Sequence, residues 1–382
     1  MEGARAELSS TERALRGAEL GWLGLYGLDA LLSVLDELSH LATGQRLLAP
    51  LRNPLAGVVL LCSPLAWLAV GLSPRLRLRV HLPLLLLLAW ITMGWAPLSI
   101  WTFGEPTFGL YPQLIQVVVA AVALVLARAQ VPATVPALRW RRLGLWLAAH
   151  LLLVPLSLGS YTFLSARLLL DSLTGGYAEL GLDGISVLHR RFERQEQTVD
   201  LIGMIHIGDE SAYRQLFEPL PADQALVLSE GVSDEQDLLA IPMDYDPVAR
   251  SLGLTPQAGI SEMSGLTERN ADVDVAEFSD QTVELLRSAM GLMHQEDKAQ
   301  ALRDYLEVAR SHPDPQHLLR LLEQDLLHLR NSHLIAEVDA ALPAHPHLVL
   351  PWGAAHLPEL DEALRTRGFE PVEERWVVLI PF

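Results

Sequence analysis

Cysteine is almost absent from this 382-residue sequence, and the one present, Cys62, lies inside an apolar run. A single cysteine excludes both an intrachain disulfide and a zinc-thiolate cluster. The lack of disulfides fits either side of a membrane, so cysteine usage does not indicate a redox compartment.

Basic residues are scarce in the second part of the chain. From Asp171 onward, 15 Lys and Arg stand against 38 Asp and Glu, a formal charge of −23, whereas the part up to Leu170 has 13 Arg, no Lys and 8 acidic residues, a formal charge of +5. An acidic surface repels phosphate backbones, and no basic stripe with interleaved aromatics occurs. We therefore expect no nucleic-acid partner, while cations and basic peptides stay open as partners.

Charges of either sign are missing from four long apolar runs, near residues 55–72, 81–101, 110–127 and 143–164. Each approaches the ~20 residues that an α-helix needs to cross a ~30 Å hydrocarbon core. The runs predict transmembrane helices, with the lipid bilayer as a partner. The first 20 residues are polar and lack a short apolar core, so we expect no cleavable signal peptide.

A fifth apolar segment, residues 21–43, carries Asp29, Asp36, Glu37 and His40. Asp29, Asp36 and His40 are spaced by seven and four residues, which places them on one helical face. Three interpretations stay open: an amphipathic helix at the membrane interface or against the bundle, a span with its polar face turned inward, or an ion or proton site.

The composition divides the chain into a polar tail (1–20), a membrane domain (21–172) and a soluble domain (173–382). Arginines gather in two short loops, at Arg75, Arg77 and Arg79 and at Arg128, Arg139, Arg141 and Arg142, whereas the loop 103–109 has only Glu105. By the positive-inside tendency, both Arg-rich loops are cytoplasmic. The last span then runs outward, which predicts a bacterial inner-membrane protein with a periplasmic C-terminal domain. Arg46 and Arg52 count mildly against this topology, because it places their loop outside.

The soluble part predicts an α/β fold, with a central mixed sheet and a helical insertion. Two β-prone runs, 184–192 and 198–205, predict a hairpin or two neighbouring strands. Buried-type strands follow at 225–229 and 347–352, with a last strand at 376–380. Between them we expect helices at 281–293, 297–310 and about 315–342.

Three of the predicted strands deliver polar side chains where they end. Gly203–His206 and Gly353–His356 are both Gly-x-x-His motifs, and Glu230 directly follows the strand at 225–229. Ligands of α/β sheets bind at the carboxyl ends of strands. Two imidazoles and a carboxylate can hold a divalent ion such as Mn, Co, Zn or Fe, which activates water. The glycines would permit a close approach or a positive φ.

Four ordered motifs make the soluble part similar to the TraB/GumN/TIKI family throughout residues 185–382. They are Leu201–Ile207 (LIGMIHI), the strand that closes on Glu230, Leu329–Asn331 (LRN) and Trp352–Pro358 (WGAAHLP). The superfamily includes erythromycin esterases and haem-associated ChaN proteins. This sequence departs in having Met204 where many members have threonine, and Gly231 after the glutamate. A multi-span N-terminal half is not the usual partner of this domain.

The resemblance implies a metal-dependent protease-like activity and a role for each matched residue. His206 and His356 would be metal ligands or catalytic bases, and Glu230 a ligand or the group that activates water. Arg330 would hold a carboxylate or stabilise an oxyanion, and Asn331 would orient a neighbour by hydrogen bonding.

We therefore expect a membrane-anchored hydrolase in which metal-activated water attacks an amide or ester carbonyl of a peptide or small molecule. Three alternatives stay open: a metal-free reaction with a histidine as general base, a non-catalytic sensor domain that signals through the bundle, and a transporter-like membrane half. Asp272 and Asp274 could add carboxylate ligands or a second general base, although their pattern favours a turn or a helix cap. The pattern also favours surface positions for His328, His333, His345 and His347.

Overall fold

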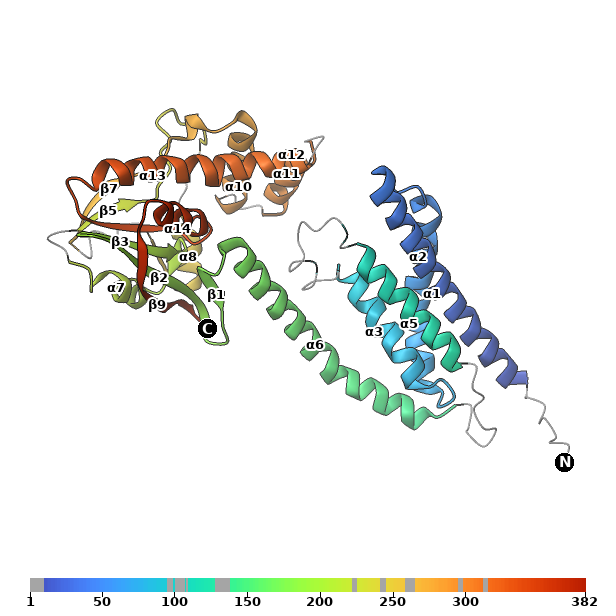
Figure 1. The fold of residues 1–382 in the computed structure, drawn as a ribbon. Coiled ribbons are helices and arrows are strands. Elements are labelled where there is room, and N and C mark those ends of the chain that lie inside the picture. The colour runs from blue at the N-terminus through green and yellow to red at the C-terminus, as the bar shows by residue number, and fades with distance from the viewer. Residues whose placement is uncertain are drawn as a thin grey trace. The chain divides into compact units, whose positions relative to one another are not determined.

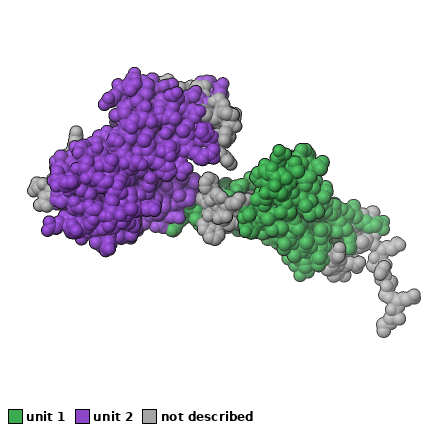
Figure 2. Space-filling model, turned by 45° about the horizontal axis from the view of Figure 1, so that its top comes forward, with its two compact units in different colours: residues 1–168 green, residues 169–382 purple. Residues whose placement is uncertain are grey.

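The computed structural model describes residues 10–94, 99, 107, 109–127, 138–221, 225–240, 245–257, 265–294, 298–311 and 315–382. The chain divides into two compact units, residues 1–168 and 169–382, which Figure 2 shows in different colours. The compositional division after residue 172 falls four residues beyond this boundary. Glu105 and Arg128, which contribute to the topology prediction, lie outside the described residues.

Apolar helices make up the described part of the first unit. Four helices of the described chain are long and apolar enough to cross a membrane, namely α1, α2, α5 and α6. The predicted span 81–101 differs, because α3 has 15 residues, about 22 Å of helix against a ~30 Å hydrocarbon core. Most of residues 95–101 lie outside the described residues. The helix bounds are α1 (Ser10–Thr43), α2 (Ala49–Leu72), α3 (Leu78–Thr92), α5 (Leu110–Ala127) and α6 (Trp140–Thr174).

Helix α1 begins at Ser10, so the predicted polar tail is helical over its second half. The helix packs against α2 and α5, with Trp22, Leu23 and Tyr26 in a shared apolar core. Asp29, Asp36 and Glu37 are buried in the same packing. Their polar face is thus turned into the helices of the unit.

Helix α6 has the opposite character, because its apolar stretch is exposed. No residue of its most apolar 18-residue window is buried, and Leu145, Leu151 and Leu152 are exposed by 74%, 80% and 72%. A continuous apolar surface of this kind is unfavourable in water and marks a lipid or protein contact.

A mixed sheet forms the centre of the second unit (Figure 1). Its strand order is β1-β2-β3-β8-β5-β7, and β9 pairs with β2. Strands β3, β8, β5 and β7 are parallel neighbours, whereas β1, β3 and β9 pair antiparallel with β2. The bounds are β1 (Ala178–Leu180), β2 (Gly184–Arg194), β3 (Gln197–Met204), β5 (Ala225–Ser229), β7 (Thr267–Asn270), β8 (His347–Gly353) and β9 (Glu370–Pro381).

Helices cover the sheet because its apolar faces must be buried. Helix α13 contacts β5, α14 contacts β3 and α7 contacts β9, and Figure 1 shows α7 on the other side of the sheet from α13. Asp209 caps α7, since its carboxylate accepts from the backbone N–H groups of Ser211 and Ala212. The helices of this unit are α7 (Glu210–Phe217), α8 (Asp246–Leu252), α10 (Asp280–His294), α11 (Lys298–Ser311), α12 (Pro315–Glu323), α13 (Arg330–Ala341) and α14 (Leu357–Thr366).

The predicted hairpin, the strands at 225–229 and 347–352 and the helices of the insertion are present in the structure. The predicted helix 315–342 differs in its centre, where α12 passes into a π-helical turn, η2 (Gln324–Leu329), before α13. The region between Glu230 and the insertion helices also contains β6 (Thr255–Pro256), which pairs with β4 (Ile207–Gly208), and the edge strand β7.

Candidate functional site

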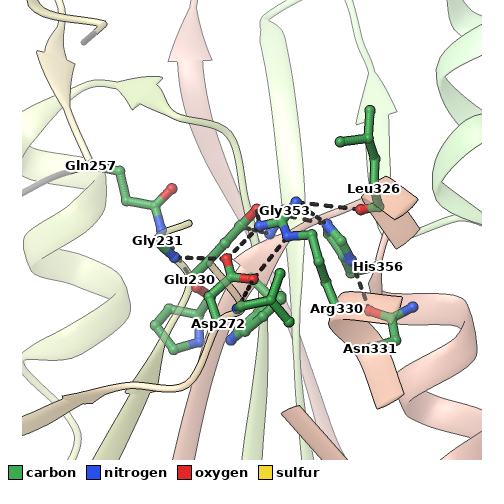
Figure 3. A network of polar contacts seen from close by, with 12 residues as sticks. Glu230, Gly231, Gln257, Asp272, Leu326, Arg330, Asn331, Gly353 and His356 are labelled. Atoms are coloured by element: carbon green, nitrogen blue, oxygen red, sulfur yellow. Dashed lines mark hydrogen bonds and ion pairs between the residues drawn. The ribbon is translucent and has the colours of Figure 1, made fainter. Parts of the chain in front are cut away.

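The carboxyl ends of three parallel strands meet at one edge of the sheet. Strand β8 lies between β3 and β5, with Met204 opposite Gly353 and Val227 opposite Val349. His206 follows β3, Glu230 follows β5, and His356 lies three residues after β8 as the N-cap of α14. Glu230 and Gly353, 123 positions apart in the sequence, are therefore in contact (Figure 3).

Glu230 is enclosed at this edge, with its side chain 5% exposed. Its Oε2 accepts from the backbone N–H of Gly353 at 2.6 Å, and its Oε1 accepts from Arg330 Nη2 at 2.7 Å. A Cβ on Gly353 would lie 3.3 Å from Glu230 Oε2. Gly353 therefore allows the close approach of Glu230. Neither Gly353 nor Gly203 has a positive φ, which was the other reason considered for a glycine at these positions.

Arg330 is the centre of the network, because it connects β5, β8 and the loop after β7. Its Nε and Nη2 donate to Asp272 at 2.9 and 2.6 Å, and Nη2 also donates to Glu230. Its Nη1 donates to the carbonyl of Leu326 at 3.3 Å and to His356 Nε2 at 3.2 Å. These contacts engage all five N–H groups of the guanidinium, so its donors are committed within the protein.

Arg330 comes directly after the π-helical turn η2, whose widened turn re-aims the side chains that follow. Trp352 packs against this cation, with the guanidinium 5.5 Å from its ring centroid. The indole N–H donates to the carbonyl of Leu228, which fixes the ring at the end of β5. The aromatic face thus holds the cation from the side that its carboxylate partners do not contact.

His356 has a defined tautomer because arginine can only donate. Its Nε2 accepts from Arg330, so the proton lies on Nδ1, which donates to Asn331 Oδ1 at 2.7 Å. Asn331 in turn donates through Nδ2 to Glu359 Oε2 at 2.6 Å. The neighbour with which Asn331 forms a hydrogen bond is therefore His356.

The charges at this edge follow from burial and from the ion pairs. Burial lowers the pKa of His356 to about 4, and the charge of Arg330 adds to this effect, so the imidazole is neutral near pH 7. Burial alone would raise the pKa of Glu230, but Arg330, His356 and His206 outweigh it, and the pKa of this carboxyl lies below its usual value. Arg330 keeps its charge, because its carboxylate partners raise its pKa despite burial.

His206 is half-buried, whereas Arg330 and His356 are buried. Its ring stacks on Tyr245, with the centroids 4.5 Å apart and the planes 14° from parallel. Its carbonyl accepts from the backbone N–H of Gln257 at 2.9 Å, which connects the end of β3 to the strand β6. His206 is close enough to influence the pKa of both Glu230 and His356, yet its ring stays outside their hydrogen bonds.

A divalent metal does not fit this arrangement of donors. The described residues contain no group of three or more His, Cys, Asp or Glu side chains arranged to hold a metal ion. The guanidinium of Arg330 contacts both Glu230 and His356 Nε2, so a metal would have to share those atoms with a cation. The ligand set of His206, Glu230 and His356 for Mn, Co, Zn or Fe stays a prediction, which elemental analysis of the purified protein tests.

Two further residues belong to the site. Asp272, for which the sequence favoured a turn or cap over a site role, is an ion-pair partner of Arg330, and it also accepts from the backbone N–H of Gly231 at 2.9 Å. Tyr245, the N-cap residue of α8, belongs to no motif that the sequence singled out. Asp274 does form a capping box with Glu277, as expected of that pair of aspartates.

The other histidines fall into two groups. His328 is exposed and lies 3.0 Å from Glu359, in agreement with a surface position. The prediction for His347 is wrong, because its side chain is 14% exposed and its Nε2 lies 2.6 Å from Asp200 Oδ2. Asp200 of β3 is fully buried and also contacts His189 and Arg191 of β2, so this cluster connects β2 and β3 to the beginning of β8.

A comparison of the chain with protein-family models, curated proteins and solved structures finds no match to any of them.

Proposed function

We propose that the second unit is a hydrolase whose active centre is the network of Glu230, Arg330 and His356, with His206 beside it. The observation that carries the proposal is the convergence of His356 and Glu230 on the buried Arg330, with His206 near enough to act on the pKa of Glu230. Buried, paired charges at the carboxyl edge of a sheet are costly to build and mark functional sites.

In the proposed reaction, His206 acts as general base. Its ring is the partly exposed imidazole of the network, so it can take a proton from water as that water attacks an amide or ester carbonyl. The negative charge of Glu230 favours the imidazolium that forms, because the glutamate lies in a low-dielectric site and is ionised.

Arg330 contributes through its fixed charge. Its donors are engaged by Asp272, Glu230 and His356, so it supports a developing oxyanion by its field rather than by a new hydrogen bond. Neutral His356 keeps the guanidinium oriented. No step of this reaction passes through a metal ion.

We further propose that the first unit anchors the enzyme in a bilayer, and that the chain is a member of the TraB/GumN/TIKI family. The exposed apolar surface of α6 supports the first part, because lipid satisfies it. Arg75, Arg77 and Arg79 favour a periplasmic C-terminal unit in a bacterial inner membrane. Arg46 and Arg52, which count against this topology, form ion pairs with Glu37 and Asp36.

The test uses the full chain in detergent with a panel of p-nitrophenyl esters and fluorogenic peptides. We expect turnover by the unsubstituted protein and a loss of about 100-fold or more in kcat/KM for His206→Ala, the usual contribution of a general base. Glu230→Gln should lose a comparable factor. His345→Ala, which removes an exposed histidine outside the site, is the matched control and should retain full activity.

An alternative is a sensor on the same scaffold, and the closed hydrogen bonding of Arg330 favours it, because no donor is left for a substrate. Thermal stabilisation by a panel compound without its conversion would support the sensor. Equal activity of the His206→Ala and His345→Ala variants would contradict the proposed base.

A further inference from the structure

Helix α1 carries a line of polar side chains through the centre of its apolar stretch. Glu19, Trp22, Tyr26 and Asp29 are spaced by three, four and three residues and thus share one face. Asp29 lies at the middle of the candidate span Arg16–Thr43. The hydrolase proposal uses none of these residues.

Asp29 is buried without a cationic partner in contact. Its Oδ2 accepts from Gln116 Nε2 of α5 at 3.0 Å, while its Oδ1 is inaccessible and has no hydrogen-bond partner among the described residues. The hydroxyl of Tyr26, one turn earlier and fully buried, is likewise unpaired within the described part of the chain.

Asp36, two turns further on, provides an internal contrast. This carboxylate is also fully buried, but its oxygens accept from Arg52 Nη1 at 3.2 Å and from the backbone N–H of Leu48 at 2.9 Å. Arg52 also acts electrostatically on Asp29, without a hydrogen bond or ion pair to it among the described residues. The same helix thus contains one compensated buried carboxylate and one uncompensated one.

A cavity of about 430 Å³ gives this line a route to the exterior of the bundle. Glu19 and His81, 2.8 Å apart, are its polar lining residues, and Trp22 forms part of its wall. Leu25, one helical turn before Asp29, also lines the cavity, and the ring of Trp22 lies 6.1 Å from that of Tyr26.

We infer that Asp29 is a proton-binding site within the helix bundle, which exchanges its proton through the cavity beside Glu19 and His81. A carboxylate without a countercharge is strongly disfavoured at the centre of a membrane span, and protonation removes the charge. The groups that face Asp29 are neutral Gln116 from α5 and Tyr26 from α1, while Arg52 from α2 is held by Asp36. The ligand of this site is a proton, and the inference is independent of the hydrolase proposal.

The test is carbodiimide labelling of the full chain in detergent, with dicyclohexylcarbodiimide as the reagent. A protonated carboxyl adds across the C=N bond of the reagent and rearranges to an N-acylurea, so the protein gains the whole mass of one reagent molecule. We expect labelling at Asp29 at least tenfold above that at Asp36 at pH 7, located by peptide mass spectrometry, and a decrease as pH rises. Asp36→Asn should label normally, and Asp29→Asn should not.

A second measurement is independent of reagent access. Infrared difference spectra between the unsubstituted protein and Asp29→Asn should contain the carbonyl stretch of one protonated carboxylic acid at pH 7. Absence of that band, or labelling of Asp36 equal to that of Asp29, would overturn the inference. Suppression of labelling by sodium ions at constant pH would also overturn it, since it would assign a cation site instead.

Discussion

At the scale of single residues, Arg330 decides whether the buried charges can coexist. Its planar guanidinium contacts Asp272 along one edge, Glu230 at a corner and His356 at the other amino group. A lysine has three donors on one nitrogen and cannot match this geometry. Without the guanidinium, two carboxylates would stay buried without a countercharge, which is strongly unfavourable.

The lowered pKa of His356 predicts that part of the protein's free energy of unfolding is lost in acid. In the unfolded chain this histidine titrates near 6.5, whereas in the folded protein its pKa is about 4. Between these values the unfolded state binds more protons, so the contribution is complete above about pH 6.5 and is lost as pH falls toward 4. The loss amounts to about 3 kcal/mol.

The measurement compares melting temperatures of the full chain and of His356→Gln between pH 7.5 and 4.5. The unsubstituted protein should lose more stability on acidification than the variant, because glutamine does not titrate. If the melting temperatures of the two proteins fall equally on acidification, the acid-sensitive part of the stability does not come from His356.

The sequence predicted those site residues that strand ends deliver, but it favoured a turn or cap for Asp272, which a loop delivers. His206, Glu230 and His356 each follow a β-prone run, so their common edge could be expected. Asp272 follows β7, a strand of four exposed residues without an apolar pattern, and its partner lies 58 positions away. No local signal predicts such a pairing, since it depends on the packing of the whole sheet.

At the scale of elements, Gly203 in β3 lies where the neighbouring backbone leaves no room for a side chain. A Cβ there would lie 3.0 Å from the carbonyl oxygen of Tyr177 and 3.3 Å from that of Leu188. Both atoms belong to the backbone and cannot move aside as a flexible side chain can. We expect Gly203→Ala to cost about 1–3 kcal/mol, the usual size of an overpacking penalty, seen as a lower melting temperature.

The control for this prediction is Gly231→Ala. At this position a Cβ would meet only the side-chain amide of Asn270, at 3.6 Å, an ordinary contact. Its φ is not positive, so alanine needs no strained backbone. An equal loss of stability in both variants would assign the effect to a general loss of glycine rather than to close approach.

Elements with a strong apolar pattern were predictable, and those without one were not. The apolar run 225–229 predicted β5 to the residue. The edge strand β7 has the sequence TERN, which resembles a loop because all four side chains are exposed. The amphipathic pattern of 315–342 predicted a helix correctly but not its π-helical turn, because the apolar positions continue on either side.

At the scale of the whole molecule, the division of charge and apolar residues predicted the two units. The first unit has apolar helices and ion pairs that are internal to it, and the second has the mixed sheet. The order of the two units along the chain could be predicted because the composition changes abruptly near residue 172. The length of α3 could not be predicted, because an apolar run does not indicate where a helix ends.

The proposed topology predicts the compartment of the C-terminus. Alkaline phosphatase fused after the exposed Phe382 should be active, since that reporter folds only where disulfides form, outside the cytoplasm. Green fluorescent protein that matures only in the cytoplasm, fused at the same residue, should stay dark. The reverse pair of results would place the second unit in the cytoplasm.

The π-helical turn makes the site sensitive to the number of residues in one helix. Each residue of an α-helix rotates the following side chains by about 100°. Six π-helical residues span about the same rotation as five α-helical ones, so loss of one residue from Gln324–Leu329 would leave Arg330 and Asn331 facing Glu230 and His356. Loss of one residue from the regular helix α12 would instead rotate the helix before the turn by about 100°. The position of a one-codon deletion in this helix therefore decides its effect on the site, so homologues are to be compared by the length of the π-helical turn as well as by residue identity.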